Sequence, residues 1–537
     1  MAQPNEKSAS ITEKETTIQG LETWLSTTPV RVVVTETTSL SDKDEAFEFL
    51  QNNPRRDELL QEGRDILDDP VKSRKLLRKI DLTIIPLLAL TYFLQALDKV
   101  ALEYTAVMGI REDTHLVGQQ YSYLGMLFWV GFLVLELPTQ MLAQHVSRLG
   151  LYLGVNIILW GITVVCHAAC TNFAGLAVVR SLLGAFESCV APILVLIIAM
   201  WYKKSEQGRR VSWHHVMANV STIVGGSVSY GCSFIKSRFA VWRTFYLIIG
   251  LLTIFAGLIV CLFLPDSPVR ARRFTEAEKA AVLLRIRDNQ SGTQNAKIKK
   301  PQVIQALKDG RVLLVAFIVL LMAVHAGGFS TFGTILTVSF GFTRQQALIL
   351  TVPMGFIGLF VVLLVGWLSD KLNDRSTILI IGTIPSILSL SLMIALDPHG
   401  RPLNKAGLLA ARLIGITGSS CLQVMFAWNA SNISGHTKKV TANALTLMFY
   451  ATGNILGTQA FRDTEAPAYT SGKITIIACL STTCFLVFIL RRWNIKLNKK
   501  NSKTLAGFSE AENEDLRTKL AFGDTPDRQN PFFVYTR

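Results

Sequence analysis

Charged residues are scarce in this chain of 537 residues, because Asp, Glu, Lys and Arg make up only 17% of it while 50% is hydrophobic. A soluble protein of this length would divide into several domains with polar surfaces, and the composition argues against that class. Strict alternation of polar and apolar residues is also missing, which excludes a membrane β-barrel. The charges that are present gather in short blocks between long apolar runs.

Motifs that carry chemistry are missing as well. The phosphate-binding pattern GxxxxGK[ST] does not occur, so ATP hydrolysis is not expected to drive any activity. HExxH and GxSxG are also missing, and we predict that the protein is not an enzyme. No CxxC pair occurs, and we interpret the eight cysteines as small apolar residues. We expect no metal, no cofactor and, because residues 1–70 are polar, no cleavable signal peptide.

Long apolar runs are what the sequence has in abundance. Twelve windows carry few charges and have about 18 or more residues, enough for a helix to cross the hydrocarbon core. They are 82–101, 121–142, 149–168, 173–201, 211–234, 242–264, 312–337, 346–368, 377–396, 407–428, 440–460 and 472–491. The predicted fold class is an all-α membrane protein with twelve transmembrane helices.

Lys and Arg concentrate in the loops on one side of these helices, the side that holds both termini. Loops rich in Lys and Arg face the cytoplasm, so we predict cytoplasmic termini. The net charge of +15 then reflects membrane topology, and no nucleic acid partner is expected.

The runs divide the chain into two groups of six helices, which suggests a repeat. We predict a disordered cytoplasmic tail, a first six-helix bundle, a cytoplasmic linker, a second six-helix bundle and a cytoplasmic tail, at 1–75, 76–264, 265–311, 312–495 and 496–537. In the linker, Thr275 and Glu278 have the spacing of a capping box, and amphipathic helices are expected at 280–287 and 303–308. The first tail offers short helices at 44–50 and 58–67.

A few charged or titratable side chains interrupt the apolar runs, namely Asp98, Lys99, Glu136, Arg180, Glu187, His325 and Arg412. A charge at bilayer depth costs roughly 3 kcal/mol or more, so such residues tend to face a cavity and one another. Arg180 and Glu187 are seven residues apart and project from one helix face, and Gly184 between them is expected to leave open space. Asp98 and Lys99 are neighbours that point in different directions, so each needs another partner, and Asp98 is expected near Arg180.

Two interpretations of these charges stay open. They can be structural ion pairs between helices, or they can form a transport site. In the second case Arg180 and Lys99 bind an anion, because an arginine fork matches a carboxylate. Asp98 and Glu187 then exchange protons, since a buried acid beside a cation can change its protonation state.

Weaker candidates lie in other runs. Glu136 and His325 are possible further proton sites, and Gln423 and Asn454 are possible substrate contacts. Glu136 precedes Pro138 and can equally be part of a helix bend. His325 can be a packed, hydrogen-bonded residue, and the two amides can join helices to one another.

Several short stretches resemble a known family when taken in order. They are LDK at 97–99, ELP at 136–138, RSLLGAFE at 180–187, WYK at 201–203 and LPDSP at 264–268. Over about residues 75–495 the chain resembles the anion:cation symporter family of the major facilitator superfamily, and within it the fungal allantoate permease branch. The resemblance implies the major facilitator fold, with two six-helix bundles, a central cavity and alternating access.

The resemblance also implies roles for residues. In bacterial members the acids of spans one and four carry protons while the bases hold an organic anion, and the matching positions here are Asp98, Lys99, Arg180 and Glu187. Lys99 replaces the arginine of the family and lacks its planar fork. The stretch at 366–371 resembles the inner loop motif of the superfamily, which implies that Asp370 and Lys371 form a gate.

We therefore predict a secondary active transporter that imports a small organic anion with protons by alternating access. Allantoate, another ureide or a vitamin-like carboxylate fits the resemblance. An exporter of a secondary metabolite on the same fold and a non-transporting nutrient sensor remain alternatives. The expected partners are the anion, protons and membrane lipid, and the chain is expected to be a multi-pass monomer of the plasma membrane.

Overall fold

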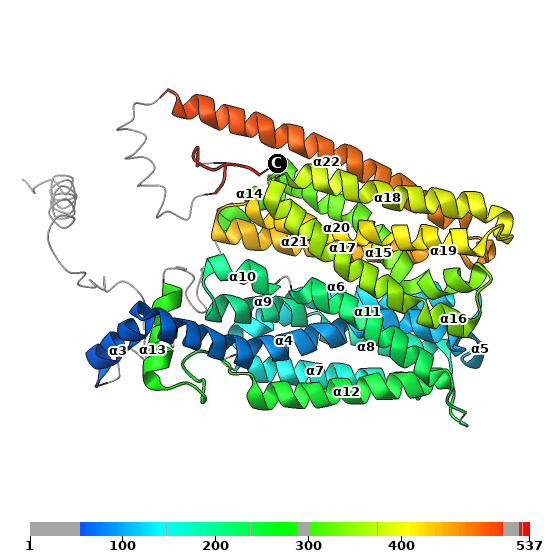
Figure 1. Ribbon diagram of the computed structural model, residues 1–537, viewed down its shortest axis with the longest axis horizontal. Coiled ribbons are helices and arrows are strands. Elements are labelled where there is room, and N and C mark those ends of the chain that lie inside the picture. Colours follow the sequence, from blue (N-terminus) through cyan, green and yellow to red (C-terminus); the bar gives the residue numbers. More distant parts are fainter. Residues whose placement is uncertain are drawn as a thin grey trace, which may run out of the picture.

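The structure is a computed structural model that describes residues 54–287 except 147, 212 and 237, residues 300–507 except 373, and residues 526–536 except 529. Every regular element in this part of the chain is a helix (Figure 1). The helix predicted at 44–50 lies outside the described residues, whereas the one predicted at 58–67 is present as α3 (Arg56–Asp68).

The long helices of the N-terminal half are α4 (Pro70–Val107), α6 (Gln120–His145), α7 (Leu149–His167), α8 (Phe173–Glu187) with α9 (Val190–Trp201), α11 (Trp213–Cys232) and α12 (Val241–Phe263). Those of the C-terminal half are α15 (Gly310–Ser339), α16 (Arg344–Ile349) with α17 (Thr351–Leu372), α18 (Arg375–Leu396), α19 (Lys405–Ile414) with α20 (Ile416–Ser431), α21 (His436–Ala460) and α22 (Thr470–Leu505). Each of the twelve predicted windows coincides with one of these helices or with a consecutive pair.

The halves form two six-helix bundles that lie side by side, the first coloured blue to green and the second green to orange (Figure 1). In the first bundle α7 packs along α12 and α6 along α8; in the second, α15 packs along α21 and α18 along α20 and α22. The bundles meet where α4 contacts α15, α6 contacts α21 and α11 contacts α17.

Ten segments of the described chain are long and apolar enough to cross a membrane by themselves. α11 and α21 occupy the two remaining predicted windows but are more polar, and α21 carries Lys438, Lys439, Asn443, Asn454 and Gln459. Both helices pack against the opposite bundle, and polar residues of membrane helices usually face a bundle interior. Their position explains why they tolerate polar residues.

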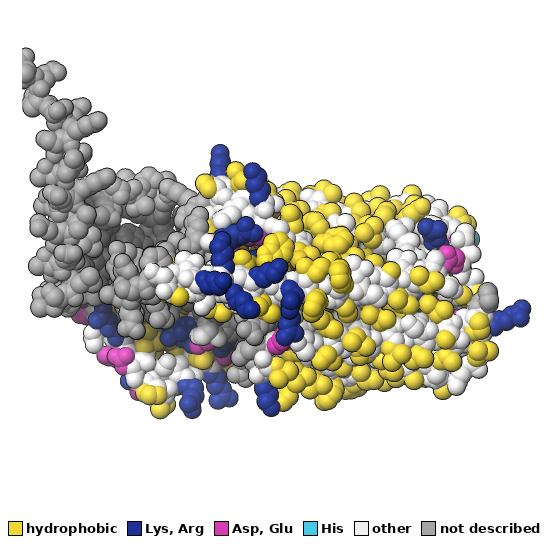
Figure 2. Space-filling view, turned by 90° about the horizontal axis from the view of Figure 1, so that it is seen from above, with side chains coloured by type: hydrophobic (Ala, Val, Ile, Leu, Met, Phe, Trp, Pro, Cys, Tyr) yellow, Lys and Arg dark blue, Asp and Glu magenta, His cyan; other side chains and the backbone are white. Residues whose placement is uncertain are grey.

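One end of the molecule, which we call the basic end, carries α3, α10 (Lys204–Val211), α13 (Glu276–Arg287), α14 (Lys300–Lys308) and the last turns of α22 (Figure 1). The opposite or distal end carries α5 (Ile110–Asp113), α16 and the start of α19. Lys and Arg side chains gather at the basic end, beside a broad hydrophobic surface (Figure 2). Large apolar side chains are also exposed on several of the long helices, including Leu262 and Phe255 on α12, Phe360 on α17 and Phe485 on α22, as expected of helices that cross a membrane.

The predicted capping box in the linker is confirmed. The backbone N–H of Thr275 donates to Glu278 Oε2 at 2.9 Å, and that of Glu278 donates to Thr275 Oγ1 at 3.2 Å. It precedes α13, which packs against α3. The prediction of disorder over 1–75 is wrong for the described residues from 54 onward, because α3 buries Leu59 and is covered by α13.

Glycine allows α6 and α8 to approach closely. A Cβ on Gly184 would lie 1.9 Å from the backbone oxygen of Phe128, and one on Gly131 would lie 2.1 Å from that of Ser181. Small residues have this role wherever membrane helices pack backbone to backbone. The expectation that Gly184 leaves open space beside the charged side chains is therefore wrong, because α6 fills that space.

Candidate functional site

The charges predicted in spans one and four meet between α4 and α8. Lys99 Nζ on α4 lies 2.9 Å from Glu187 Oε1 on α8. The Glu187 side chain is fully buried, whereas 25% of the Lys99 side chain is exposed. The Lys99 ammonium also lies 5.7 Å from the centre of the Trp129 ring on α6, so an aromatic face flanks the ion pair.

Asp98 points away from its neighbour Lys99, as adjacent helical residues do. Its Oδ2 accepts a hydrogen bond from Trp160 Nε1 of α7, while its Oδ1 has no hydrogen-bond partner among the described residues. Asp98 is 2% exposed and lies close enough to Lys99, Arg180 and Glu187 to interact electrostatically with each of them. These two acids and two bases form one group, buried except for part of the Lys99 side chain, which we call the charged cluster.

Arg180 on α8 is held in place by Tyr246 on α12. Arg180 Nη2 donates to the Tyr246 hydroxyl at 2.8 Å. The same hydroxyl lies 3.3 Å from Thr105 Oγ1 on α4, and the Tyr246 ring stacks on His167 of α7 with 4.7 Å between ring centres. Within the described chain, Arg180 Nε lacks a hydrogen-bond acceptor, so the guanidinium keeps a donor for a ligand.

Unsatisfied polar atoms give the charged cluster a capacity for ligands. Besides Asp98 Oδ1 and Arg180 Nε, both amide atoms of the buried Gln95 lack hydrogen bonds of good geometry to described residues, although Gln95 borders Glu187. Leaving such groups unsatisfied costs free energy. A carboxylate would accept from the two bases, and protons would neutralise the acids, so both kinds of ligand would supply what the cluster lacks.

The other predicted proton sites lie outside the charged cluster. Glu136 on α6 is 2% exposed, and its Oε1 accepts from Gln140 Nε2 at 3.4 Å. His325 on α15 belongs to the other bundle, where its Nδ1 lies 3.3 Å from Ser419 Oγ and its ring packs against Phe329. A proton role for either residue stays a prediction.

The two predicted amide contacts use their N–H groups within the protein. Gln423 Nε2 on α20 donates to the backbone oxygen of Val362 on α17 at 3.2 Å. Asn454 Nδ2 on α21 donates to the backbone oxygen of Tyr450, one turn earlier, at 2.8 Å. Each amide retains its oxygen, and substrate contact by either stays a prediction.

The predicted gate is only partly described. The side chain of Asp370 lies outside the described residues, and Lys371 is exposed. Between α17 and α18 an ion pair comes instead from Asp374, whose Oδ2 lies 2.9 Å from Arg491 Nη2 on α22. The Oδ1 of Asp374 caps α18 by accepting from the Thr377 N–H at 3.2 Å. Burial raises the pKa of Asp374, but hydrogen bonds and Arg491 outweigh this and hold it below the ordinary value. The preference for Asp at helix starts was the signal that could have identified it.

Glu103 is the main residue that the sequence-based prediction missed. Its Oε1 on α4 lies 3.3 Å from Arg412 Nη2 on α19, and both side chains are less than a tenth exposed. Arg412 also donates to the backbone oxygen of Gly333, and the Thr334 hydroxyl donates to that of Glu103. This group joins the two bundles, and we call the Glu103–Arg412 pair the latch. The predicted first span ends at residue 101, just before Glu103, whereas α4 continues to Val107.

More exposed ion pairs join the bundles at the distal end. Arg111 Nη2 lies 2.8 Å from Asp463 Oδ1, and Arg344 Nη2 lies 2.7 Å from Glu112 Oε1. Arg111, Glu112 and Arg344 line a pocket of about 500 Å³ that also borders Val107. Latch and outer pairs together hold the distal halves of the two bundles against each other.

Comparison with known proteins agrees with this architecture. Residues 88–458 match the Major Facilitator Superfamily. The chain is 35% identical over 492 residues to the allantoate permease of Saccharomyces cerevisiae, covering 89% of each chain. It is 32% identical over 520 residues to the thiamine pathway transporter of the same yeast, covering 94% of this chain and 95% of that one.

Solved structures share the fold at low sequence identity. The D-xylose-proton symporter matches with a TM-score of 0.58 and 13% identity, over 75% of this chain and 97% of that one. A bacterial homolog of the human lysosomal transporter Spinster matches with a TM-score of 0.58 and 16% identity, over 76% and 96%. The predicted fold class and family resemblance are thereby confirmed. The chain belongs to the Major Facilitator Superfamily and is a multi-pass membrane transporter related to fungal allantoate permease.

Proposed function

We propose that this transporter carries a small organic anion together with protons, and that the charged cluster couples the two. The observation that carries the proposal is the Lys99–Glu187 ion pair, 2.9 Å long and beside Asp98 and Arg180 in the N-terminal bundle. Two acids and two bases sum to zero charge. Entry of one anion alone would bury an extra negative charge, whereas one monoanion with one proton leaves the sum unchanged, and buried charge is costly unless it is balanced.

The proposed cycle begins when a proton reaches the Glu187 carboxylate. Neutral Glu187 no longer holds the Lys99 ammonium, which then binds one oxygen of the substrate carboxylate. Arg180, oriented by Tyr246, offers its Nε–H to the other oxygen. Asp98 remains as a second acid, because its Oδ1 can take a proton while its Oδ2 keeps the bond from Trp160. The loaded, balanced cluster then permits the change of access.

The basic end is proposed to face the cytoplasm, together with both termini, because Lys and Arg gather there. The distal end then faces the outside of the plasma membrane. Opening toward the outside requires separation of the latch and of the Arg111–Asp463 and Arg344–Glu112 pairs. The chain is proposed to carry out this cycle as a monomer.

Import of a ureide such as allantoate, or of a vitamin-like carboxylate, is the proposed direction and substrate class. Similarity to an allantoate permease over 89% of the chain supports it. The chemistry of the site supports it too, because Lys99 and Arg180 suit a carboxylate. The planar fork of Arg180 provides geometric selection, and Lys99 adds a compact charge.

The test is uptake by the purified protein in liposomes with an imposed pH gradient, acidic outside. The panel contains allantoate, other ureides and small carboxylates, each beside its neutral amide. We expect accumulation of at least one carboxylate only when the gradient is present, and none of the matching amide. Accumulation that ignores the gradient, or equal accumulation of the amide, would contradict the proposal.

A further inference from the structure

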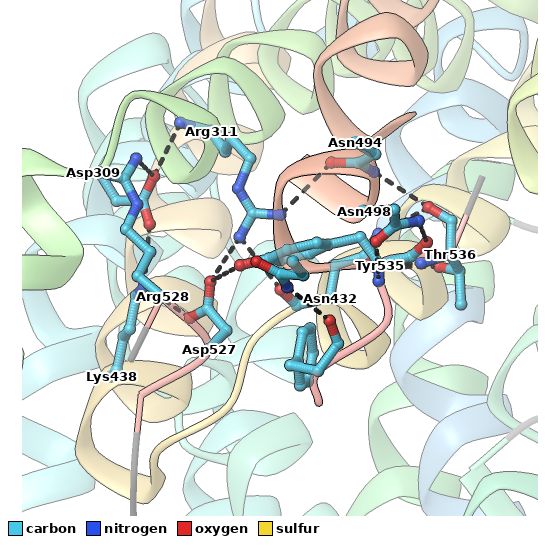
Figure 3. Close-up of polar contacts among 12 residues, drawn as sticks. Asp309, Arg311, Asn432, Lys438, Asn494, Asn498, Asp527, Arg528, Tyr535 and Thr536 are labelled. Atoms are coloured by element: carbon cyan, nitrogen blue, oxygen red, sulfur yellow. Dashed lines mark hydrogen bonds and ion pairs between the residues drawn. The ribbon is translucent and has the colours of Figure 1, made fainter. Parts of the chain in front are cut away.

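The last described residues of the chain are docked at the basic end of the C-terminal bundle (Figure 3). Asp527 lies between Arg311 at the start of α15 and Lys438 at the start of α21. Its Oδ2 is 2.7 Å from Arg311 Nη2, and its Oδ1 is 2.6 Å from Lys438 Nζ. The three side chains are between 0% and 4% exposed, so the carboxylate of the tail is bound in a buried pocket.

The backbone beyond Asp527 is held by side-chain amides (Figure 3). Asn498 on α22 donates to the Tyr535 oxygen at 2.8 Å and accepts from the Tyr535 N–H at 2.9 Å. The Thr536 N–H donates to Asn432 Oδ1, just after α20, at 2.7 Å, and Asn494 Nδ2 on α22 donates to the Thr536 oxygen at 3.0 Å. Three asparagines thus satisfy the tail backbone as a neighbouring strand would.

Tyr535 completes the pocket around Asp527. Its hydroxyl donates to Asp527 Oδ2 at 3.0 Å, and the guanidinium carbon of Arg311 lies 4.0 Å from the centre of its ring. Tyr535 is 2% exposed, whereas its neighbour Val534 is 73% exposed. Docking therefore selects an acidic residue and an aromatic residue, and it leaves Val534 in solvent between Tyr535 and Phe533, whose backbone oxygen accepts from Asn501 Nδ2 at 3.0 Å.

Asp309, the N-cap of α15, closes the network from the opposite side. It lies 2.8 Å from Lys438 Nζ and 2.7 Å from Arg528 Nη2. If the tail left, Lys438 would keep Asp309 as a partner, but Arg311 would lose its ion pair. The vacated pocket would then contain a buried cation without its counter-charge and would bind another carboxylate. The pocket is therefore specific for a negative charge such as that of Asp527.

We propose that residues 526–536 form a releasable clasp, bound through Asp527 in a carboxylate-binding pocket of Arg311 and Lys438, that ties the basic ends of α15, α20, α21 and α22 into one unit. Apart from the buried Tyr535 ring, hydrogen bonds and ion pairs hold the segment, and it is tethered to α22, so it rebinds as an intramolecular ligand. The clasp does not depend on which solute is carried or on proton coupling.

The test is hydrogen–deuterium exchange, read by mass spectrometry on the full-length protein in lipid nanodiscs. Asp527→Asn removes the anchor charge, and Val534→Ala is the matched control on the exposed side of the same segment. In the parent and in Val534→Ala, the amides of Tyr535 and Thr536 should exchange more slowly than in a free peptide and faster than those in the middle of α15. In Asp527→Asn they should exchange at least about tenfold faster, as should the first turns of α15 and α21.

A second variant keeps the test decisive if Asp527→Asn does not fold. Asn498→Ala removes two hydrogen bonds to the Tyr535 backbone from a partly exposed position on α22, and it should speed exchange of the same amides. Unchanged exchange in a folded variant of either kind would overturn the clasp. Free-peptide exchange rates in the parent would overturn docking, and rates equal to those in the middle of α15 would overturn release.

Discussion

Removing the acid of the latch should shift the transporter toward a state that is open at its distal end. Glu103→Gln leaves Arg412 buried without a counter-charge, and breaking a buried pair in this way costs about 3–5 kcal/mol. The two side chains are only 7% and 9% exposed, so solvent screens the pair little. Opening lets water reach Arg412, and the cost therefore falls on the closed state. Because about 1.4 kcal/mol is a factor of ten, even a third of this cost raises the open fraction about tenfold.

The assay is labelling of Val107→Cys by a hydrophilic maleimide, followed by mass spectrometry of the peptide that contains this position. Val107 borders the distal pocket and is 6% exposed, so labelling reports opening. The matched control is Glu112→Gln, which removes the acid of the Glu112–Arg344 pair. Its side chains are 56% and 61% exposed, and such a pair contributes about 0–1 kcal/mol. Equal labelling rates in the two variants would refute the assignment of the latch.

Three further outcomes are expected. Gly184→Ala should lower the thermal stability and folded yield, because its Cβ would strike the backbone of α6, whereas Gly231→Ala, with open space at its Cβ, should leave both unchanged in a melting experiment. Tyr246→Phe should raise the KM for the transported anion more than it lowers the maximal rate, because it removes only the hydroxyl that orients Arg180, and uptake kinetics would separate the two. Low pH should reduce the stability of the basic end. Burial raises the pKa of Asp309, but the neighbouring cations outweigh this effect and hold the pKa below its ordinary value. An acid with a lowered pKa stabilises the protein at pH values above its ordinary pKa, near 4, and this stabilisation is lost as the pH falls through the pKa of the folded state. The Tm should therefore fall less between about pH 6 and pH 3 in Asp309→Asn than in the parent protein.

The meeting of the charged residues was predictable from local rules. Helical spacing places Arg180 and Glu187 on one face, and charges at bilayer depth seek one another. The individual pairs were not predictable, because Lys99–Glu187 and Arg180–Tyr246 depend on how α4, α7 and α12 are rotated around α8. The hydrogen bond from Trp160 to Asp98 depends on the same helix rotation, and no pattern along the chain encodes that rotation.

Residue spacing also fails to predict the role of a residue where that role depends on backbone geometry or on contacts with residues far away in the sequence. Gly184 sits between two charged residues, but its function is the approach of α6, which involves residues some fifty positions earlier. The docking of Asp527 depends on Lys438, 89 residues away. The tail has no hydrophobic periodicity from which docking could be predicted, because ion pairs and hydrogen bonds to residues far away in the sequence hold Asp527 and the backbone that follows it.

Transport by Glu187→Gln in liposomes is the most direct test of coupling through the charged cluster. The variant is fixed in the uncharged form, so the step that needs proton release is blocked while the anion can still exchange. We predict that labelled substrate exchanges for unlabelled substrate at a near-parental rate, and that accumulation driven by a pH gradient is lost. Parental gradient-driven accumulation together with normal exchange would contradict the assignment of Glu187 as the coupling acid.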